Sequence, residues 1–216
     1  MFPRMTTLAL GALAAATLAA APAQAGVIFH QDFSGGLQAN EKLAGNFSIG
    51  FGKMGHTAGL YANNERSFYD LRVDLSGVTD ALFSFDWLQS TESGWDGWNL
   101  LVAGDGEAFD PASPFAAKPT VYNRHTGALG AAGVTGNSYG RAVFNLQPFV
   151  GKVVNLRIQF ASDQGLVGTG VTFDNLVVSG TPISTSAAPE PGVWALMILG
   201  FMGAGAMLRR RGQILA

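Results

Sequence analysis

The 216-residue chain contains no cysteine, which excludes disulfide bridges, thiolate metal sites and cysteine nucleophiles. Histidine is almost as scarce, and the three residues, His30, His56 and His125, lack the spacing of metal ligands. Neither a Gly-x-Ser-x-Gly motif nor a His-Glu-x-x-His zinc motif occurs. Because the motifs of the common hydrolases are missing, we expect a protein that is not an enzyme.

Charge is also sparse, since charged side chains make up only 13% of the chain. Residues 26–188 hold nine basic and fourteen acidic residues, a net charge of −5, and their basic residues form no cluster. An acidic segment of this kind argues against nucleic acid and anionic lipid as partners.

Residues 1–25 have the composition of a secretory signal peptide. Arg4 supplies a positive charge near the start, and an uncharged apolar run follows over residues 8–21. Ala23 and Ala25 then form the small-x-small pattern that signal peptidase reads. The alternative is an N-terminal membrane anchor, but the run is short for a bilayer span and no charged flank follows it. We therefore expect signal peptidase to remove this segment from an exported protein.

A second apolar segment lies near the C-terminus. Residues 192–208 carry no charge and are followed by Arg209, Arg210 and Arg211. As a helix this segment would be about 26 Å long, enough to cross a slightly thinned hydrocarbon core. The arginines would stay on the cytoplasmic side, which places the middle of the chain outside the inner membrane. The sequence thus predicts one transmembrane helix over residues 192–208 with an arginine stop.

The pattern between the two ends is that of β-strands. Phe83, Phe85 and Trp87 alternate with the polar residues Ser84 and Asp86. This period of two predicts a strand with one buried and one solvated face. Other candidate strands cover residues 27–33, 67–73, 98–103, 141–146, 154–160 and 171–179.

Pieces rich in glycine, asparagine and aspartate separate these strands. Many short strands punctuated in this way favour an all-β, jelly-roll-like β-sandwich over residues 26–180. Residues 105–140 are rich in proline, alanine and glycine, and form either an extended surface loop or a pair of short edge strands. Residues 181–188 are small and polar, which suits a flexible spacer.

Residues 189–212 combine a Pro-Glu-Pro tripeptide, a nearby tryptophan, the apolar segment and the arginine stop. The residues concerned are Pro189, Glu190, Pro191, Trp194, Arg209, Arg210 and Arg211. This arrangement resembles the PEPxxWA variety of the PEP-CTERM sorting signal.

In that family, the span holds the protein transiently in the inner membrane until an exosortase, a membrane-embedded cysteine protease, cuts near the tripeptide. The cut protein is released or passed to the cell surface, usually in organisms that make exopolysaccharide. The resemblance implies that the tripeptide is recognised by exosortase and is not catalytic. The alternative for the same segment is a permanent single-span anchor.

The predicted domain carries a second resemblance. Gln159–Asp163 and Phe173–Val178 resemble segments of the QFxxD family of PEP-CTERM proteins. With the opening at residues 31–36 and the strand at 151–157, they also resemble jelly-roll domains of the choice-of-anchor J and MAM-like types. Residues 105–140 are unmatched. None of these resemblances implies an established catalytic activity.

Asp174 lies inside an apolar strand, where a carboxylate is costly unless it is hydrogen-bonded, paired or bound to metal. The jelly-roll resemblance implies that the first and last strands are neighbours and that acidic residues there often hold a structural calcium. Asp32 and Asp174 are therefore candidate calcium ligands, to which carbonyls and a further carboxylate would add. The alternative is that Asp174 caps a turn or accepts backbone N–H groups at a bulge.

Trp95 is the candidate for contact with a glycan, because it stands in a glycine-rich turn where we expect its side chain to be exposed. Trp87 continues the apolar face of its strand and is expected in the core. A glycosidase would need two facing carboxylates, and Glu92 and Asp96 are the nearest pair. They lack the signature of jelly-roll glucanases.

Three hypotheses for function remain. The leading one is a non-enzymatic cell-surface or extracellular-matrix protein, sorted by exosortase and linked to exopolysaccharide or biofilm. The second, from a different class, is a carbohydrate-binding module that uses the Trp95 region. The third is a polysaccharide-modifying hydrolase, for which the sequence offers no catalytic constellation.

Overall fold

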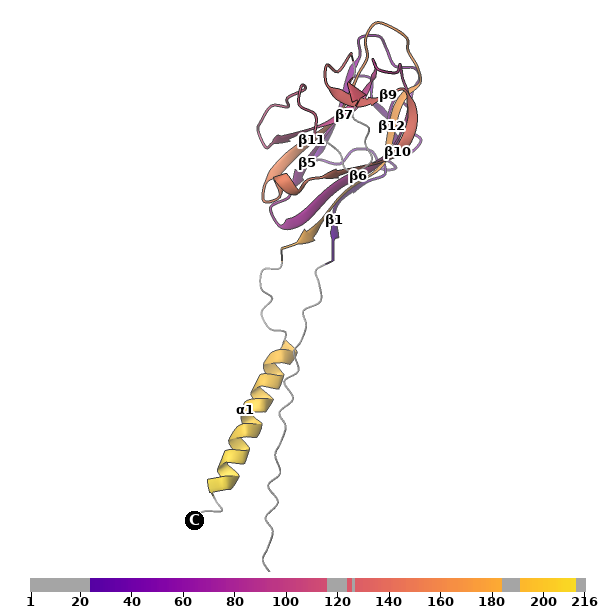
Figure 1. Ribbon diagram of the computed structural model, residues 1–216. Helices are drawn as coiled ribbons and strands as arrows, with labels where there is room; N and C mark the ends of the chain where they lie inside the picture. Colours follow the sequence, from indigo (N-terminus) through magenta and orange to yellow (C-terminus); the bar gives the residue numbers. More distant parts are fainter. Residues whose placement is uncertain (1–23, 116–123, 126, 184–190, 213–216) are drawn as a thin grey trace, which may run out of the picture.

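The computed structural model describes residues 24–115, 124–125, 127–183 and 191–212. Its strands form two antiparallel β-sheets, sheet A and sheet B, which pack face to face over one hydrophobic core (Figure 1). The prediction of an all-β sandwich is therefore confirmed. The signal peptide up to residue 23, spacer residues 184–188 and the Pro189-Glu190 part of the tail motif lie outside the described residues.

Sheet A has the strand order β10-β6-β12-β4-β3, and β1 also pairs with β12. Its strands are β1 (Gly26–Gln31), β3 (Ser48–Gly50), β4 (Lys53–Gly55), β6 (Val78–Ser90), β10 (Asn137–Asn145) and β12 (Gly170–Pro182). The long strands β6 and β12 lie side by side, and β1 and β4 share the other side of β12. The first and last strands of the sandwich are therefore neighbours, as the jelly-roll resemblance implied.

Sheet B has the order β2-β5-β11-β7-β9-β8. Its strands are β2 (Glu41–Ala44), β5 (Arg66–Asp74), β7 (Gly97–Gly104), β8 (Arg124–His125), β9 (Ala132–Thr135) and β11 (Val153–Ala161). β11 pairs along its whole length with β5 and nearly its whole length with β7. A short 3₁₀ helix, Gln147–Phe149, leads from β10 towards β11.

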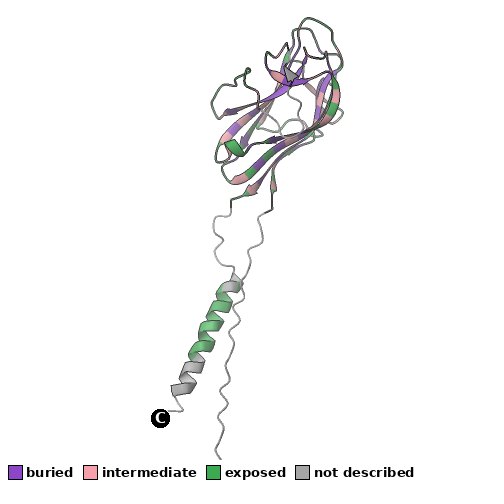
Figure 2. Cartoon of the chain, in the orientation of Figure 1, coloured by how far each residue is buried: buried purple, intermediate pink, exposed green. Residues whose placement is uncertain are grey.

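Alternation along the strands builds the core from both sheets. Phe83, Phe85 and Trp87 of β6 point inward and are buried, while the residues between them lie on the outer face. The ring of Phe85 lies 5.4 Å from that of Trp98 in sheet B and 5.5 Å from that of Phe173 in sheet A. Figure 2 shows the buried positions following the strands of both sheets. Each fully buried phenylalanine contributes about 1.5–3 kcal/mol, so this aromatic layer stabilises the sandwich.

All of the strands predicted from alternation form, whereas alternation did not predict β2, β3, β4, β8 and β9. Each has two to four residues, too few to show a period. β8 and β9 pair at the edge of sheet B, which confirms the second alternative for residues 105–140, a pair of short edge strands. β3 and β4 form a hairpin closed by Phe51 and Gly52, whose φ angles of 55° and 68° suit a type I′ turn.

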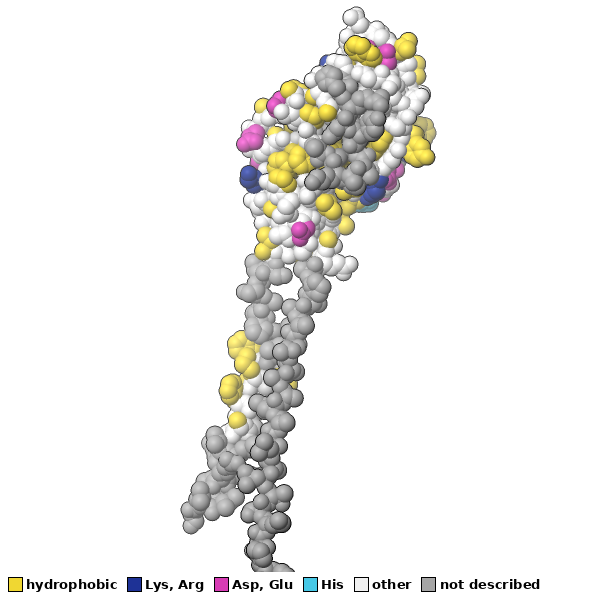
Figure 3. Space-filling view, viewed as in Figure 1, with side chains coloured by type: hydrophobic (Ala, Val, Ile, Leu, Met, Phe, Trp, Pro, Cys, Tyr) yellow, Lys and Arg dark blue, Asp and Glu magenta, His cyan; other side chains and the backbone are white. Residues whose placement is uncertain are grey.

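The predicted C-terminal helix also forms, as α1 (Pro191–Gly212). Its described side chains are largely apolar and exposed, as at Trp194 and Leu196. Figure 3 shows hydrophobic side chains on the surface of this helix. Within the part of the chain that the structure describes, no helix is both long enough and apolar enough to count as a candidate membrane span. The predicted transmembrane helix over residues 192–208 is therefore not confirmed.

Candidate functional site

Three connecting segments gather at one end of the sandwich, which we call the loop end. They are residues 56–65 between β4 and β5, residues 91–96 between β6 and β7, and residues 162–169 between β11 and β12. Backbone hydrogen bonds join the first segment to the third: Asn64 N–H donates to Asp163 O at 2.6 Å, and Ser162 N–H donates to Glu65 O at 3.2 Å. Segments about a hundred residues apart are therefore held together here.

The loop end brings three carboxylates together. Glu92, Asp96 and Asp163 each place an oxygen within 4.8 Å of the others, and among the described residues they are the one group of three or more such side chains. Asp96 is fully buried, and the other two are half-buried. Sequence reasoning paired Glu92 with Asp96 but missed Asp163, although it ends the Gln159–Asp163 motif. Carboxylate oxygens are ligands that Ca²⁺ accepts, so a hard cation is the ligand that these residues could hold.

These carboxylates also fasten the loops. Asp96 accepts hydrogen bonds from the Tyr61 hydroxyl at 2.7 Å and from Asp163 N–H at 2.9 Å. Glu92 accepts from Leu166 N–H at 3.1 Å, and Asp163 accepts from Gly165 N–H at 2.6 Å. Burial raises the pKa of Asp96 against the lowering effect of its hydrogen bonds, and burial also raises the pKa of Tyr61.

A buried hydrogen-bonded pair lies beside this group. His56 Nε2 is 2.8 Å from Glu65 Oε1, and His56 Nδ1 accepts a hydrogen bond from Val171 N–H at 3.0 Å. Because Nδ1 is an acceptor, the ring proton sits on Nε2 and is donated to Glu65. Burial alone would raise the pKa of Glu65, but hydrogen bonds from His56, Ser67 and Ala62 N–H outweigh it and lower the pKa to about 2. Sequence reasoning missed this pair, because the histidines looked scattered.

The two predicted calcium ligands lie away from this group. β1 and β12 are paired, yet each carboxylate makes a local hydrogen bond. Asp32 is exposed and accepts from Ser34 N–H at 3.0 Å and from Ser34 Oγ–H at 2.7 Å, and the backbone bond lowers the pKa of Asp32. Asp174 accepts from Asn175 N–H at 2.7 Å, which confirms the alternative of a bulge. Calcium binding by Asp32 and Asp174 stays a prediction.

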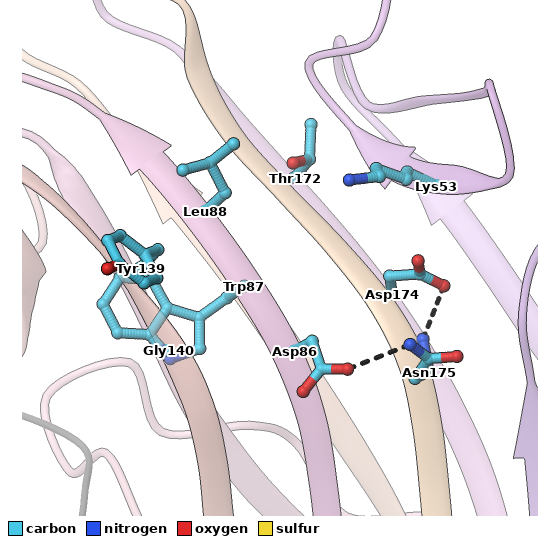
Figure 4. Close-up of a pocket in the computed structure, with 9 residues that line it drawn as sticks. All are labelled: Lys53, Asp86, Trp87, Leu88, Tyr139, Gly140, Thr172, Asp174 and Asn175. Atoms are coloured by element: carbon cyan, nitrogen blue, oxygen red, sulfur yellow. Dashed lines mark hydrogen bonds between the residues drawn. The ribbon is translucent and has the colours of Figure 1, made fainter.

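Asp174 is not enclosed by apolar side chains, since it is half-buried on the outer face of sheet A. The pairing of β12 with β6 is irregular between Asp174 and Val177, and Asn175 has a φ of 51°. The bulge turns Asp174 and Asn175 to the same face, whereas regular alternation would point them to opposite faces. Asn175 Nδ2 donates to Asp86 Oδ2 at 2.9 Å (Figure 4).

A hollow of about 490 Å³ surrounds this bulge on the outer face of sheet A. Its lining residues are Lys53, Asp86, Trp87, Leu88, Tyr139, Gly140, Thr172, Asp174 and Asn175 (Figure 4). Of these, sequence reasoning had named only Asp174 as a candidate ligand. The alternation of β6 put Asp86 on a polar face, but nothing in the sequence showed that Tyr139 lies on the adjacent strand.

Trp87 and Trp95 are placed as expected. Trp87 and Trp98 are buried, and Trp95 is 52% exposed at the loop end. The Trp95 ring lies so close to the Gly127 backbone that a Cβ at residue 127 would come within 2.1 Å of it. The exposure of Trp95 is confirmed, and its contact with a glycan stays a prediction.

Fold and site together define an all-β, two-sheet antiparallel sandwich with polar clusters at one end and on one outer face. No family model and no curated protein matches the chain. It is similar to the carbohydrate-binding module TmCBM27, studied for specific mannan recognition, at 14% identity and a TM-score of 0.34, covering 73% of this chain and 99% of that one. It is also similar to the K1 cleaved adhesin domain of Lys-gingipain from Porphyromonas gingivalis W83, at 10% identity and a TM-score of 0.36, covering 71% and 98%. At these values neither likeness carries an argument about function.

Proposed function

We propose that the protein is an exported, non-enzymatic cell-surface or extracellular-matrix protein linked to exopolysaccharide or biofilm. Its folded part is a jelly-roll-like sandwich, and its tail at residues 189–212 is the sorting signal. Signal peptidase removes residues 1–25, the helix holds the protein transiently in the inner membrane, and exosortase then cuts near the Pro-Glu-Pro tripeptide.

The non-enzymatic part of the proposal rests on one observation: the titratable groups at the loop end form hydrogen bonds that hold the loops in place. Both oxygens of Asp96 accept hydrogen bonds from neighbouring loops, and Glu92 holds Leu166 N–H. His56 and Glu65 have side chains only 2% exposed and bind each other. Catalytic acids and bases must reach a substrate, whereas these groups fasten loops.

The sorting part of the proposal is supported by the tail motif and by the helix that begins at Pro191, the last residue of its tripeptide. We test it by fractionating cells with and without exosortase, comparing the wild-type chain with the double variant Pro189→Ala, Glu190→Ala. Thr185→Ala, in the spacer, is the matched control. With exosortase present, wild type and control are expected at the surface or in the medium in a shortened form, and the double variant in the membrane fraction at full length.

Cells without exosortase should retain all three proteins unprocessed. If the full-length form of the wild type persists equally with and without exosortase, the tail is a permanent anchor and the sorting proposal is wrong.

A further inference from the structure

The outer face of sheet A carries exposed apolar side chains on two neighbouring strands, and a threonine continues the row on a third. Tyr139 of β10 lies opposite Leu88 of β6, which in turn lies opposite Thr172 of β12. Tyr139 is 82% exposed and Leu88 is 54% exposed, although both stand on regular strands beside the hollow. An exposed tyrosine ring on a rigid strand is a flat contact surface that loses little entropy when a ligand covers it.

A polar row runs directly beside it. Arg141, Asp86 and Asp174 lie opposite one another on β10, β6 and β12, and the bulge adds Asn175 to the same face. Arg141 Nη1 is 2.9 Å from Asp86 Oδ1, and Asn175 Nδ2 is 2.9 Å from Asp86 Oδ2. The donors and acceptors are thus positioned by one another before a ligand arrives. The left-handed backbone of Asn175 is a conformation that non-glycine residues adopt at a cost.

The charges of this face point to an uncharged ligand. Around the hollow, the two carboxylates of Asp86 and Asp174 are matched by two cations, Lys53 and Arg141, so no local excess of one sign attracts an ion. A ligand with one apolar face and a rim of hydroxyl groups fits both rows, because its apolar face packs on the first row and its hydroxyls form hydrogen bonds with the second. A pyranose ring has this construction, because its C–H groups stack on aromatic rings and its hydroxyls bond to carboxylates and amides. The volume of about 490 Å³ lies within the usual range for ligand sites.

We propose that this outer face, centred on Tyr139, Asp174 and Asn175, binds a neutral polysaccharide chain. The proposal rests on the proposed function in one respect, because a link to exopolysaccharide supplies such a ligand. Tyr139 and Leu88 stack against sugar rings, and Asp174 and Asn175 bond to the hydroxyls. The ligand lies across β10, β6 and β12, in a hollow that Trp95 does not line.

The test uses the full chain purified in detergent and run through native gels that contain hydroxyethyl cellulose, galactomannan or dextran. Alginate and chitosan serve as anionic and cationic contrasts. At least one neutral polymer should retard the wild type, and Tyr139→Ala should weaken that binding about tenfold or more, while Tyr139→Phe keeps the ring and most of the binding. Asn175→Gly, which tolerates the positive φ, should also weaken it.

Leu166→Ala is the matched control, because it removes an exposed apolar side chain outside the hollow and should bind as the wild type does. Trp95→Ala tests the alternative site at the loop end. The proposal is overturned if no neutral polymer retards the chain, if only alginate or chitosan does, or if Tyr139→Ala binds like the wild type. Loss of binding in Trp95→Ala alone would assign the site to the loop end. None of these outcomes depends on sorting, so a failure here leaves the exosortase proposal intact.

Discussion

At the scale of single residues, the buried polar groups decide which stretches of chain can meet. Glu65 accepts hydrogen bonds from His56, Ser67, Asn46 and the backbone of Ala62, and so holds together the stretch between residues 46 and 67 beside the loop end. Hydrogen bonds to the ionised form keep its pKa low, at about 2, in spite of burial. The folded state therefore favours the charged carboxylate.

We predict that Glu65 makes stability depend on pH in the acid range. Its pKa is lower in the folded state than the ordinary value of 4.5, so its contribution is complete above about pH 4.5 and is lost as the pH falls through about 2. Glu65→Gln should lower the free energy of unfolding by about 3 kcal/mol at pH 7 and by much less near pH 2. Urea unfolding followed by tryptophan fluorescence measures both. An equal loss at the two pH values would contradict the prediction, and the exposed Glu107→Gln is the control.

At the scale of elements, the short strand β9 can pair with β7 only because the two backbones come very close to each other. Gly97 begins β7, and a Cβ added there would lie 1.9 Å from the carbonyl oxygen of Val134 in β9. The edge of sheet B, where β9 and β8 extend the sheet, can form only because residue 97 has no side chain. Periodicity did not predict β9, because a four-residue strand at an edge shows no pattern.

We predict that Gly97→Ala separates β7 from β9 and lowers the free energy of unfolding by about 1–3 kcal/mol, as overpacking does. Gly77→Ala is the matched control, because nothing lies within 4 Å of a Cβ at residue 77, and it should change stability little. Hydrogen exchange of the Val134 and Thr135 amides should increase in Gly97→Ala. Equal melting temperatures for the two variants would show that the edge adjusts freely.

At the scale of the whole molecule, the sandwich and the tail are separate structural units. The buried core cluster is made of sandwich residues, whereas the described apolar side chains of α1, such as Leu196 and Phe201, are exposed. β12, by contrast, pairs with β6, β1 and β4 and completes the middle of sheet A. Stability of the sandwich should therefore depend on β12 and not on the tail.

We predict that a chain ending at residue 188 melts within about 2 °C of the full chain, because no core contact is lost. A chain ending at residue 175 lacks half of β12 and should not fold cooperatively. Circular dichroism during heating measures both. A fall of more than about 5 °C on removal of residues 189–216 would show that the tail packs on the sandwich.

The sequence by itself determined the fold class and much of the strand inventory, because a strand with one buried face needs alternating side chains, as in Phe83 to Trp87. It also determined the tail motif and the exposure of Trp95, since local composition shows both. Only the tertiary structure decided the polar clusters. Asp163 meets Glu92 and Asp96, and Asn175 meets Asp86, through strand pairings that span about 70 to 90 residues. Such pairings depend on register and on one bulge, and no local pattern records either.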